Sequence, residues 1–301
     1  NAGNSITGGG NYNTVVGDEA GTAITTGDNN VAIGYASLDA LNTASNNTAI
    51  GHNALTLDTK GSNSVAIGKG TLANQNFTSA TDSYNVAVGS SAGNDITTGE
   101  QNTLIGGLAG DALTDADFNV AFGKSALSTD TLGSRSTAIG TAALFTQNFT
   151  SATNTYNTAV GFYAGLALTT GTENTLIGGL AGDAITTGVR NTAVGYNAGG
   201  SITTGDFNTA VGRTALENVT TADGNTAVGV AAGAQTTTGA NNTAMGYLAL
   251  NLNTTGTRNT AVGAASLDAN TTAVDNTAIG YDAMSANTTG QMNVAVGTYA
   301  F

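Results

Sequence analysis

One short pattern of polar and hydrophobic positions recurs along the chain: Asn, a β-branched residue, a small apolar residue, a larger apolar residue and Gly, as in residues 157–161. Fourteen of the intervals between copies are 17 residues long and two are 21. Such strict periodicity predicts an array of stacked units. The closing glycines, expected to be structural corners, are Gly17, Gly34, Gly51, Gly68, Gly89, Gly106, Gly123, Gly140, Gly161, Gly178, Gly195, Gly212, Gly229, Gly246, Gly263, Gly280 and Gly297.

The three residues before each closing glycine are predicted to form a strand. The first is Thr or Val, and β-branched residues favour extended backbone. The third is always Val, Ile, Phe or Met, from Val16 to Val296, so we expect its side chain to be buried. The middle residue is Ala in most copies and points to the opposite face. Two apolar faces indicate a second packing surface, unless the alanines are exposed and merely small.

A second segment follows each glycine, as at residues 213–216, and is interpreted as the other strand of the repeat. A Thr-Thr-Gly turn then follows in many copies, as at 203–205, where the glycine is expected to allow a positive φ. Units of this kind stack on one another and share a core. We therefore predict an all-β fold, a parallel β-solenoid or β-roll of about 17 coils with two short strands per coil, forming a single array over residues 1–301 without a separate second domain.

The position four residues before the glycine is Asn, except at Ser64 and Ser136. Identical amides stacked in one column can hydrogen-bond from one unit to the next, as in the ladders of cross-β structures. The sequence therefore predicts a structural amide ladder.

The two long intervals carry nearly the same insertion, at residues 75–81 and 147–153. Phe77 and Phe149 lie in these insertions, and Tyr84 and Tyr156 follow them. Loops that leave a rigid scaffold often bind partners, so we take these four aromatic residues as candidate interaction residues. The alternative is that the insertions only bulge and pack Phe against a neighbouring chain.

Composition excludes several classes of protein. The chain has 301 residues, 9% of them charged, with 43 Gly and no Pro, Cys or Trp. Without cysteine there is neither a disulfide framework nor a thiolate metal site. The net charge of −13 opposes binding to nucleic acid, and no apolar run is long enough for a membrane span.

Catalytic chemistry finds no support in the sequence. His52 is the only histidine, it follows a corner glycine at a variable position, and no Ser or carboxylate nearby completes a triad. We expect no catalytic residues, no cofactor and no metal site, with only sporadic Ca²⁺ binding conceivable, because the Asp residues do not form one regular column. Asp28 and Asp206 share one column, Asp39, Asp111, Asp183 and Asp268 share another, and the rest scatter.

Residues 63–68, with the sequence Asn-Ser-Val-Ala-Ile-Gly, resemble the head repeats of trimeric autotransporter adhesins, and similar repeats occur in phage tail fibres. The resemblance implies that three chains each form a left-handed parallel β-roll, pack around a common axis and display a surface that binds host matrix or receptors. The period of 17 is longer than the usual head repeat, and the chain shows no neck and no heptad stalk.

We expect a non-enzymatic fibrous protein of the cell or virion surface, the rod-like head or shaft of a homotrimeric adhesin or tail fibre, which attaches to a host or cell-surface receptor. The alternative is an extracellular filament whose subunits join end to end, because the chain starts and stops within a coil without a visible cap, as a mature product or cut piece would. The Thr column also raises ice binding, but Thr shares its face with the residue expected to be buried, which counts against it.

Overall fold

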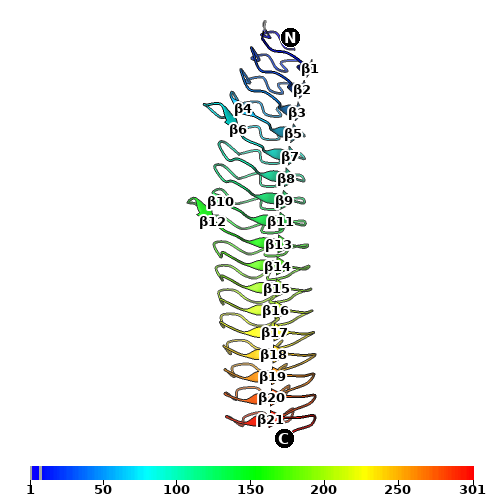
Figure 1. The fold of residues 1–301 in the computed structure, drawn as a ribbon, viewed down its shortest axis with the longest axis vertical. Helices are drawn as coiled ribbons and strands as arrows, with labels where there is room; N and C mark the ends of the chain where they lie inside the picture. The colour runs from blue at the N-terminus through cyan, green and yellow to red at the C-terminus, as the bar shows by residue number, and fades with distance from the viewer. Residues whose placement is uncertain (1, 7–8) are drawn as a thin grey trace. The chain divides into compact units, whose positions relative to one another are not determined.

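The computed structural model describes residues 2–6 and 9–301 and shows a parallel β-solenoid of about 17 coils, as predicted (Figure 1). The chain divides into two compact units, Asn1–Tyr156 and Asn157–Phe301, which we call unit 1 and unit 2. Among the described residues, no helix has the length and hydrophobicity that a membrane crossing requires.

In unit 1, eight three-residue strands stack in parallel, one per coil, and each pairs with the equivalent strand of the next coil. Four two-residue strands lie beside the insertions, where β4 pairs with β6 and β10 with β12, and Figure 1 shows both pairs outside the main column. The strands are β1 (Thr14–Val16), β2 (Val31–Ile33), β3 (Thr48–Ile50), β4 (Gly61–Ser62), β5 (Val65–Ile67), β6 (Thr81–Asp82), β7 (Val86–Val88), β8 (Thr103–Ile105), β9 (Val120–Phe122), β10 (Gly133–Ser134), β11 (Thr137–Ile139) and β12 (Thr153–Asn154).

In unit 2, nine strands stack in the same way without interruption, each in register with the residue 17 positions further along, as in Thr192 opposite Thr209. The strands are β13 (Thr158–Val160), β14 (Thr175–Ile177), β15 (Thr192–Val194), β16 (Thr209–Val211), β17 (Thr226–Val228), β18 (Thr243–Met245), β19 (Thr260–Val262), β20 (Thr277–Ile279) and β21 (Val294–Val296).

The second segment of each coil also hydrogen-bonds to both neighbouring coils. In unit 2, the N–H of Thr214 donates to the carbonyl of Tyr196 at 3.0 Å, and the N–H of Gly199 donates to the carbonyl of Ala215 at 2.9 Å. Every second residue of the segment has a left-handed backbone, with φ of 54° at Thr214 and 48° at Leu216. The prediction of a second paired segment in each coil is confirmed.

The strand faces are reversed relative to our expectation. The middle alanine of the strand is the buried residue, with Ala32 and Ala193 completely inaccessible, whereas the Val, Ile, Phe or Met before the glycine points outward. Val16 is 55% exposed and Phe122 53% exposed. The prediction that the larger residue is buried was therefore wrong. Leucines and isoleucines of the rest of the coil, such as Leu38, fill the interior, so the strand facing them has room only for a methyl group.

The coils with Leu in the alanine column show how the volume of the strand residue is balanced by the volume of the residue on the opposite wall. Leu104 and Leu176 are buried at positions where most coils have Ala. A Cβ added to Gly110 would lie 2.8 Å from a methyl group of Leu104, and one added to Gly182 would lie 2.7 Å from a methyl group of Leu176. Many coils with Ala in the strand have a leucine at the position of these glycines, as at Leu38, and others have Gly, as at Gly199. A large strand residue is thus accommodated by a glycine on the opposite wall.

The two glycine columns are required for different reasons. The corner glycines have positive φ, +139° at Gly229 for example, and an added Cβ there would lie 2.5 Å from the carbonyl oxygen of Gly246 in the next coil. The glycines of the Thr-Thr-Gly turns do not have positive φ, so that prediction was wrong. A Cβ on Gly188 would instead lie 2.6 Å from the carbonyl oxygen of Gly205, so close approach of successive coils excludes a side chain.

Candidate functional site

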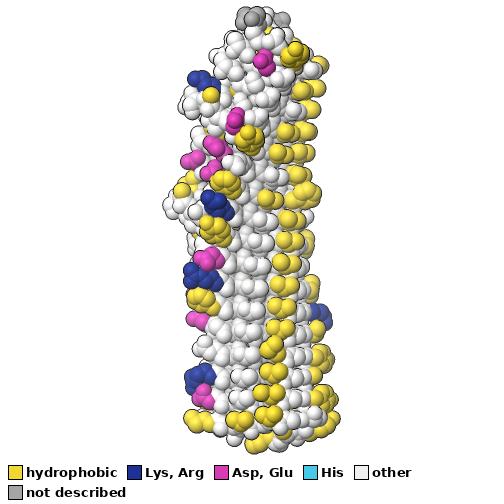
Figure 2. Space-filling model, viewed as in Figure 1, with side chains coloured by type: hydrophobic (Ala, Val, Ile, Leu, Met, Phe, Trp, Pro, Cys, Tyr) yellow, Lys and Arg dark blue, Asp and Glu magenta, His cyan; other side chains and the backbone are white. Residues whose placement is uncertain are grey.

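The outward strand residues of each unit form an exposed stripe, which we call the outer stripe. It consists of the Thr or Val column three residues before the corner glycine and the Val, Ile, Phe or Met column one residue before it. Ile177 is 39% and Met245 43% exposed, and the Thr residues are half-buried. Figure 2 shows hydrophobic side chains gathered in rows that pass from coil to coil. The exposed face that we inferred as a second packing surface therefore carries Thr and larger apolar residues, whereas the alanine face is buried.

The Thr hydroxyls of the outer stripe make no side-chain hydrogen bonds to other described residues, although the backbone N–H groups beneath them are paired. In unit 2 the column is unbroken over eight coils. It contains Thr158, Thr175, Thr192, Thr209, Thr226, Thr243, Thr260 and Thr277. These threonines are displayed beside exposed apolar residues, which removes the argument that they lie at the edge of the core.

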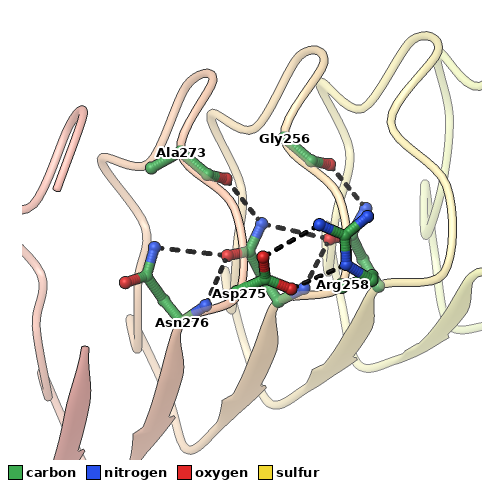
Figure 3. A network of polar contacts seen from close by, with 7 residues as sticks. Gly256, Arg258, Ala273, Asp275 and Asn276 are labelled. Carbon is green, nitrogen blue, oxygen red and sulfur yellow. Dashed lines mark hydrogen bonds and ion pairs between the residues drawn. The ribbon is translucent and has the colours of Figure 1, made fainter. Parts of the chain in front are cut away.

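The predicted amide ladder is present in both units and is buried. The backbone N–H of Asn276 donates to Oδ1 of Asn259 at 3.1 Å, while Nδ2 of Asn259 donates to the carbonyl of Ala273 at 2.8 Å (Figure 3). Each asparagine thus joins two stretches of backbone that lie 14 and 17 residues away. The ladder satisfies polar groups that would otherwise be buried without partners, which makes its role structural.

Glutamines of the insertions compensate for the two serines in the ladder of unit 1. Nε2 of Gln75 donates to Oγ of Ser64 at 3.2 Å and to Oδ2 of the buried Asp58 at 2.6 Å, and Nδ2 of Asn85 donates to Oε1 of Gln75 at 2.9 Å. The equivalent contacts of Gln147 repeat this arrangement at Ser136. The insertions are therefore anchored in the interior.

The structure separates the four aromatic candidates into two classes. Phe77 and Phe149 are 5% and 7% exposed, and their backbone N–H groups donate to Oδ1 of Asp58 and Asp130 at 3.2 and 3.0 Å. These phenylalanines fold back onto the preceding coil of the same chain, so their side chains are covered within the chain, and contact with a partner stays a prediction. Insertions of this length must bury some apolar surface of their own, which the isolated motif could not show.

Tyr84 and Tyr156 are 55% and 57% exposed. Both stand five residues before a corner glycine, and they belong to a column of unit 1 that also contains Gln101, Phe118 and Arg135. We call these five residues the tyrosine column. Sequence reasoning missed its three other members, although aromatic residues at the same position of every second coil would have indicated it.

In unit 2 the same position carries two pairs of opposite charges, and Phe207, also at this position, lies 5.5 Å from the guanidinium of Arg190. Arg190 makes two hydrogen bonds with the carboxylate of Glu173, and Arg258 makes two with that of Asp275 (Figure 3). The hydrogen bond from each arginine lowers the pKa of its carboxyl partner. These pairs are exposed, so they contribute little to stability.

One half-buried carboxylate, that of Asp183, gives unit 2 a pH dependence of its own. Burial raises the pKa of Asp183, and its Oδ1 atom lies buried without a hydrogen-bond partner. A raised pKa means that the folded state prefers the protonated carboxyl. The stabilisation from the proton is complete below the unfolded pKa, roughly 4, and is lost as pH rises through the folded pKa. At neutral pH the ionised Asp183 therefore destabilises the fold.

We predict that Asp183→Asn raises the melting temperature at pH 7 and that the gain shrinks as the pH is lowered toward 4, because the wild-type carboxyl then becomes neutral too. Asp39→Asn is the control, since Asp39 occupies the same position of another coil but accepts a hydrogen bond from Thr56 at 2.7 Å. Thermal unfolding of both variants across this pH range tests the prediction. A gain for Asp183→Asn that is independent of pH would contradict it.

The other residues that we considered for catalysis or metal binding do not lie together in one site. His52 stacks on Tyr35 at a ring distance of 5.2 Å, next to a corner glycine. The described part of the chain contains no group of three or more His, Cys, Asp or Glu residues arranged to hold a metal ion. Asp28 and Asp206 accept backbone N–H groups from the preceding coil, at 2.7 and 2.8 Å. These two carboxylates therefore have structural partners.

Comparison with known protein families, with curated proteins and with solved structures found no match to this chain. The likeness to adhesin head repeats consequently stays a resemblance of motif, and the exposed surfaces of the coils are the basis for an inference about function.

Proposed function

We propose that this chain is a non-enzymatic segment of a fibrous attachment protein, the head or shaft of a trimeric adhesin or phage tail fibre, which works outside the cell at a cell or virion surface. The observation that carries the proposal is the outer stripe, in which the coils of each unit expose larger apolar residues beside half-buried Thr or Val. Contiguous exposed apolar surface of this kind marks an interaction site.

A second copy of the same chain is the partner that fits the outer stripe best. The stripe repeats once per coil, so only a partner with the same spacing can match its ridges and grooves over many coils, and an identical solenoid has that spacing. Pairing of identical stripes also avoids burying charge, because the stripe residues of strands β13 to β21 are all Thr, Val, Ile or Met. The motif resemblance supports three copies around a common axis.

We expect the native protein to have three times the mass of one chain in solution, and the double variant Val194→Glu with Val228→Glu to have the mass of a monomer, because two charges in each stripe cannot be buried without partners. Sedimentation or light scattering measures both. Thr204→Glu is the control, because Thr204 is exposed and lies outside the stripe. A monomeric native protein would contradict trimerisation, and assemblies that grow with concentration would favour the filament alternative.

Ice binding is a second candidate, because the threonines of unit 2 are displayed in a regular array with hydroxyls that make no hydrogen bond to other described residues. A face cannot be buried against another chain and also contact ice, so the two functions compete for the outer stripe. Thermal hysteresis of the same native preparation distinguishes them. Hysteresis that disappears in Thr209→Glu would support ice binding, and its absence from the native protein would exclude it.

A further inference from the structure

The tyrosine column of unit 1 presents three aromatic rings at a regular spacing. Tyr84, Phe118 and Tyr156 are 55%, 41% and 57% exposed, and each lies two coils from the next. Neighbouring strands of a sheet lie about 4.8 Å apart, so rings two coils apart are about 10 Å apart. All three residues have the same left-handed backbone, with φ between 50° and 60°. The scaffold therefore fixes the spacing of the three rings and gives all three residues the same backbone conformation.

Polar groups occupy the coils between the rings. Gln101 lies between the first two rings, and Arg135 lies between the second and the third. The guanidinium of Arg135 stands 4.7 Å from the centre of the Phe118 ring, and its Nε donates to Oδ1 of Asn154, from β12, at 2.9 Å. These two contacts hold Arg135 in place while its terminal nitrogens make no hydrogen bond to a described residue. Polar side chains thus alternate with aromatic rings along the column, and Arg135 covers one face of the Phe118 ring, which is still 41% exposed.

The surroundings of the tyrosine column are acidic. Glu100 and Asp117 directly precede Gln101 and Phe118 in the chain, and the N–H of Glu100 donates to Oδ1 of Asp117 at 2.8 Å. Burial and the charge of Asp117 raise the pKa of Glu100. Together with the net charge of −13, this arrangement repels polyanions, while the guanidinium of Arg135 inside the column disfavours polycations, so neutral ligands remain as candidates.

We propose that the tyrosine column binds a neutral, extended, β-linked polysaccharide that lies across successive coils of unit 1. The C–H face of a pyranose stacks on an aromatic ring, and an extended β-linked chain presents the same face every second sugar, over a length close to two coils. Gln101, Arg135, Glu100 and Asp117 then hydrogen-bond the sugar hydroxyls beside the rings. This inference rests on the proposed attachment function and names the chemical class of its target.

A proline-rich peptide is the main competitor, because one turn of a polyproline helix is about 9 Å long and such helices dock on aromatic residues. Those peptides insert their prolines into slots between neighbouring rings. No two rings of the tyrosine column are in contact among the described residues, since a polar residue separates each pair. Isolated rings form platforms for flat sugar faces and do not form slots.

The test uses the native full chain with insoluble cellulose and chitin, and with soluble hexasaccharides of glucose and of N-acetylglucosamine in β linkage. We expect binding to at least one of these probes, and at least a tenfold loss of affinity in the triple variant Tyr84→Ala, Phe118→Ala, Tyr156→Ala. The double variant Tyr84→Phe, Tyr156→Phe keeps the rings and should keep binding. Tyr247→Ala is the matched control, because Tyr247 is 59% exposed in unit 2.

Each outcome decides the proposal. The proposal would be overturned if none of the four probes bound, or if Tyr247→Ala lost as much affinity as the triple variant. It would also be overturned if a polyproline peptide or heparin bound in place of the four neutral glycans. The mass of every variant in solution is measured alongside. A native trimer that binds no glycan contradicts only the polysaccharide inference, whereas glycan binding by a monomer contradicts only trimerisation.

Discussion

Alanine in place of Gly178 is expected to destabilise unit 2 by roughly 4 kcal/mol or more, a loss at the upper end of what single substitutions cause. Gly178 has a φ of +136°, a conformation that L side chains rarely adopt, and an added Cβ would lie 2.7 Å from the carbonyl carbon of Gly195. That carbon belongs to the backbone of the next coil and cannot move aside alone. Relieving the contact would separate β14 from β15.

The neighbouring residue provides a matched control. Gly179 does not have a positive φ, and the nearest atom to an added Cβ would be Cδ2 of Tyr196 at 3.7 Å, an ordinary van der Waals distance. Gly179→Ala should therefore change stability by less than about 0.5 kcal/mol. Chemical denaturation followed by circular dichroism measures both variants. Similar midpoints for the two would show that the corner does not require glycine.

Asn208→Ala is expected to destabilise the fold by about 3 kcal/mol or more, because it removes several buried hydrogen bonds together. Oδ1 of Asn208 accepts the backbone N–H of Asn225 at 3.0 Å, and its Nδ2 donates to the carbonyl of Ala222 at 2.8 Å. Asn208 is 1% exposed, so water does not replace these partners. Two backbone groups would remain buried and unpaired, each at a cost of about 1 to 3 kcal/mol.

Thr204→Ala is the control for this variant, because Thr204 is exposed and its side chain makes no hydrogen bond to a described residue. Denaturant midpoints of the two variants should differ clearly. In addition, amide hydrogen exchange should accelerate at Asn225 in Asn208→Ala, because its N–H loses its acceptor. An unchanged exchange rate at Asn225 would contradict the role assigned to the ladder.

The period of the sequence predicted the stacking of the coils, since each column holds one chemical type and every strand pairs with its equivalent. The amide ladder was predictable for the same reason. At Ser64 and Ser136 the compensation could not be foreseen, because Gln75 and Gln147 enter the interior from insertions that break the period. How a coil accommodates a single exception to the repeat depends on three-dimensional contacts that the columns of the sequence do not show.

Alternation of side chains along the strand did not by itself predict which face of each strand is buried. Both strand faces are apolar, and the larger residue was assigned to the core by the usual preference. The deciding information was the volume on the opposite wall, where leucines such as Leu38 leave room only for alanine. Leu104 and Gly110 carried this signal as a compensating pair. The four aromatic residues of the insertions were selected together, and the sequence could not show that Tyr84 and Tyr156 are exposed while Phe77 and Phe149 are buried, because a loop motif does not reveal which aromatic residue anchors it.

In unit 2 every ladder residue is Asn and the ladder bonds connect residues that are one coil apart in the chain, so no coil of this unit depends on a particular ladder partner elsewhere in the sequence. A gene that gains or loses a whole number of repeats therefore encodes a protein in which every remaining ladder bond can form. The near-identical insertions, 72 residues apart, fit a history of unequal recombination in which whole blocks were copied. Coil number is consequently a property that selection can alter in single genetic events, without repairing the core afterwards.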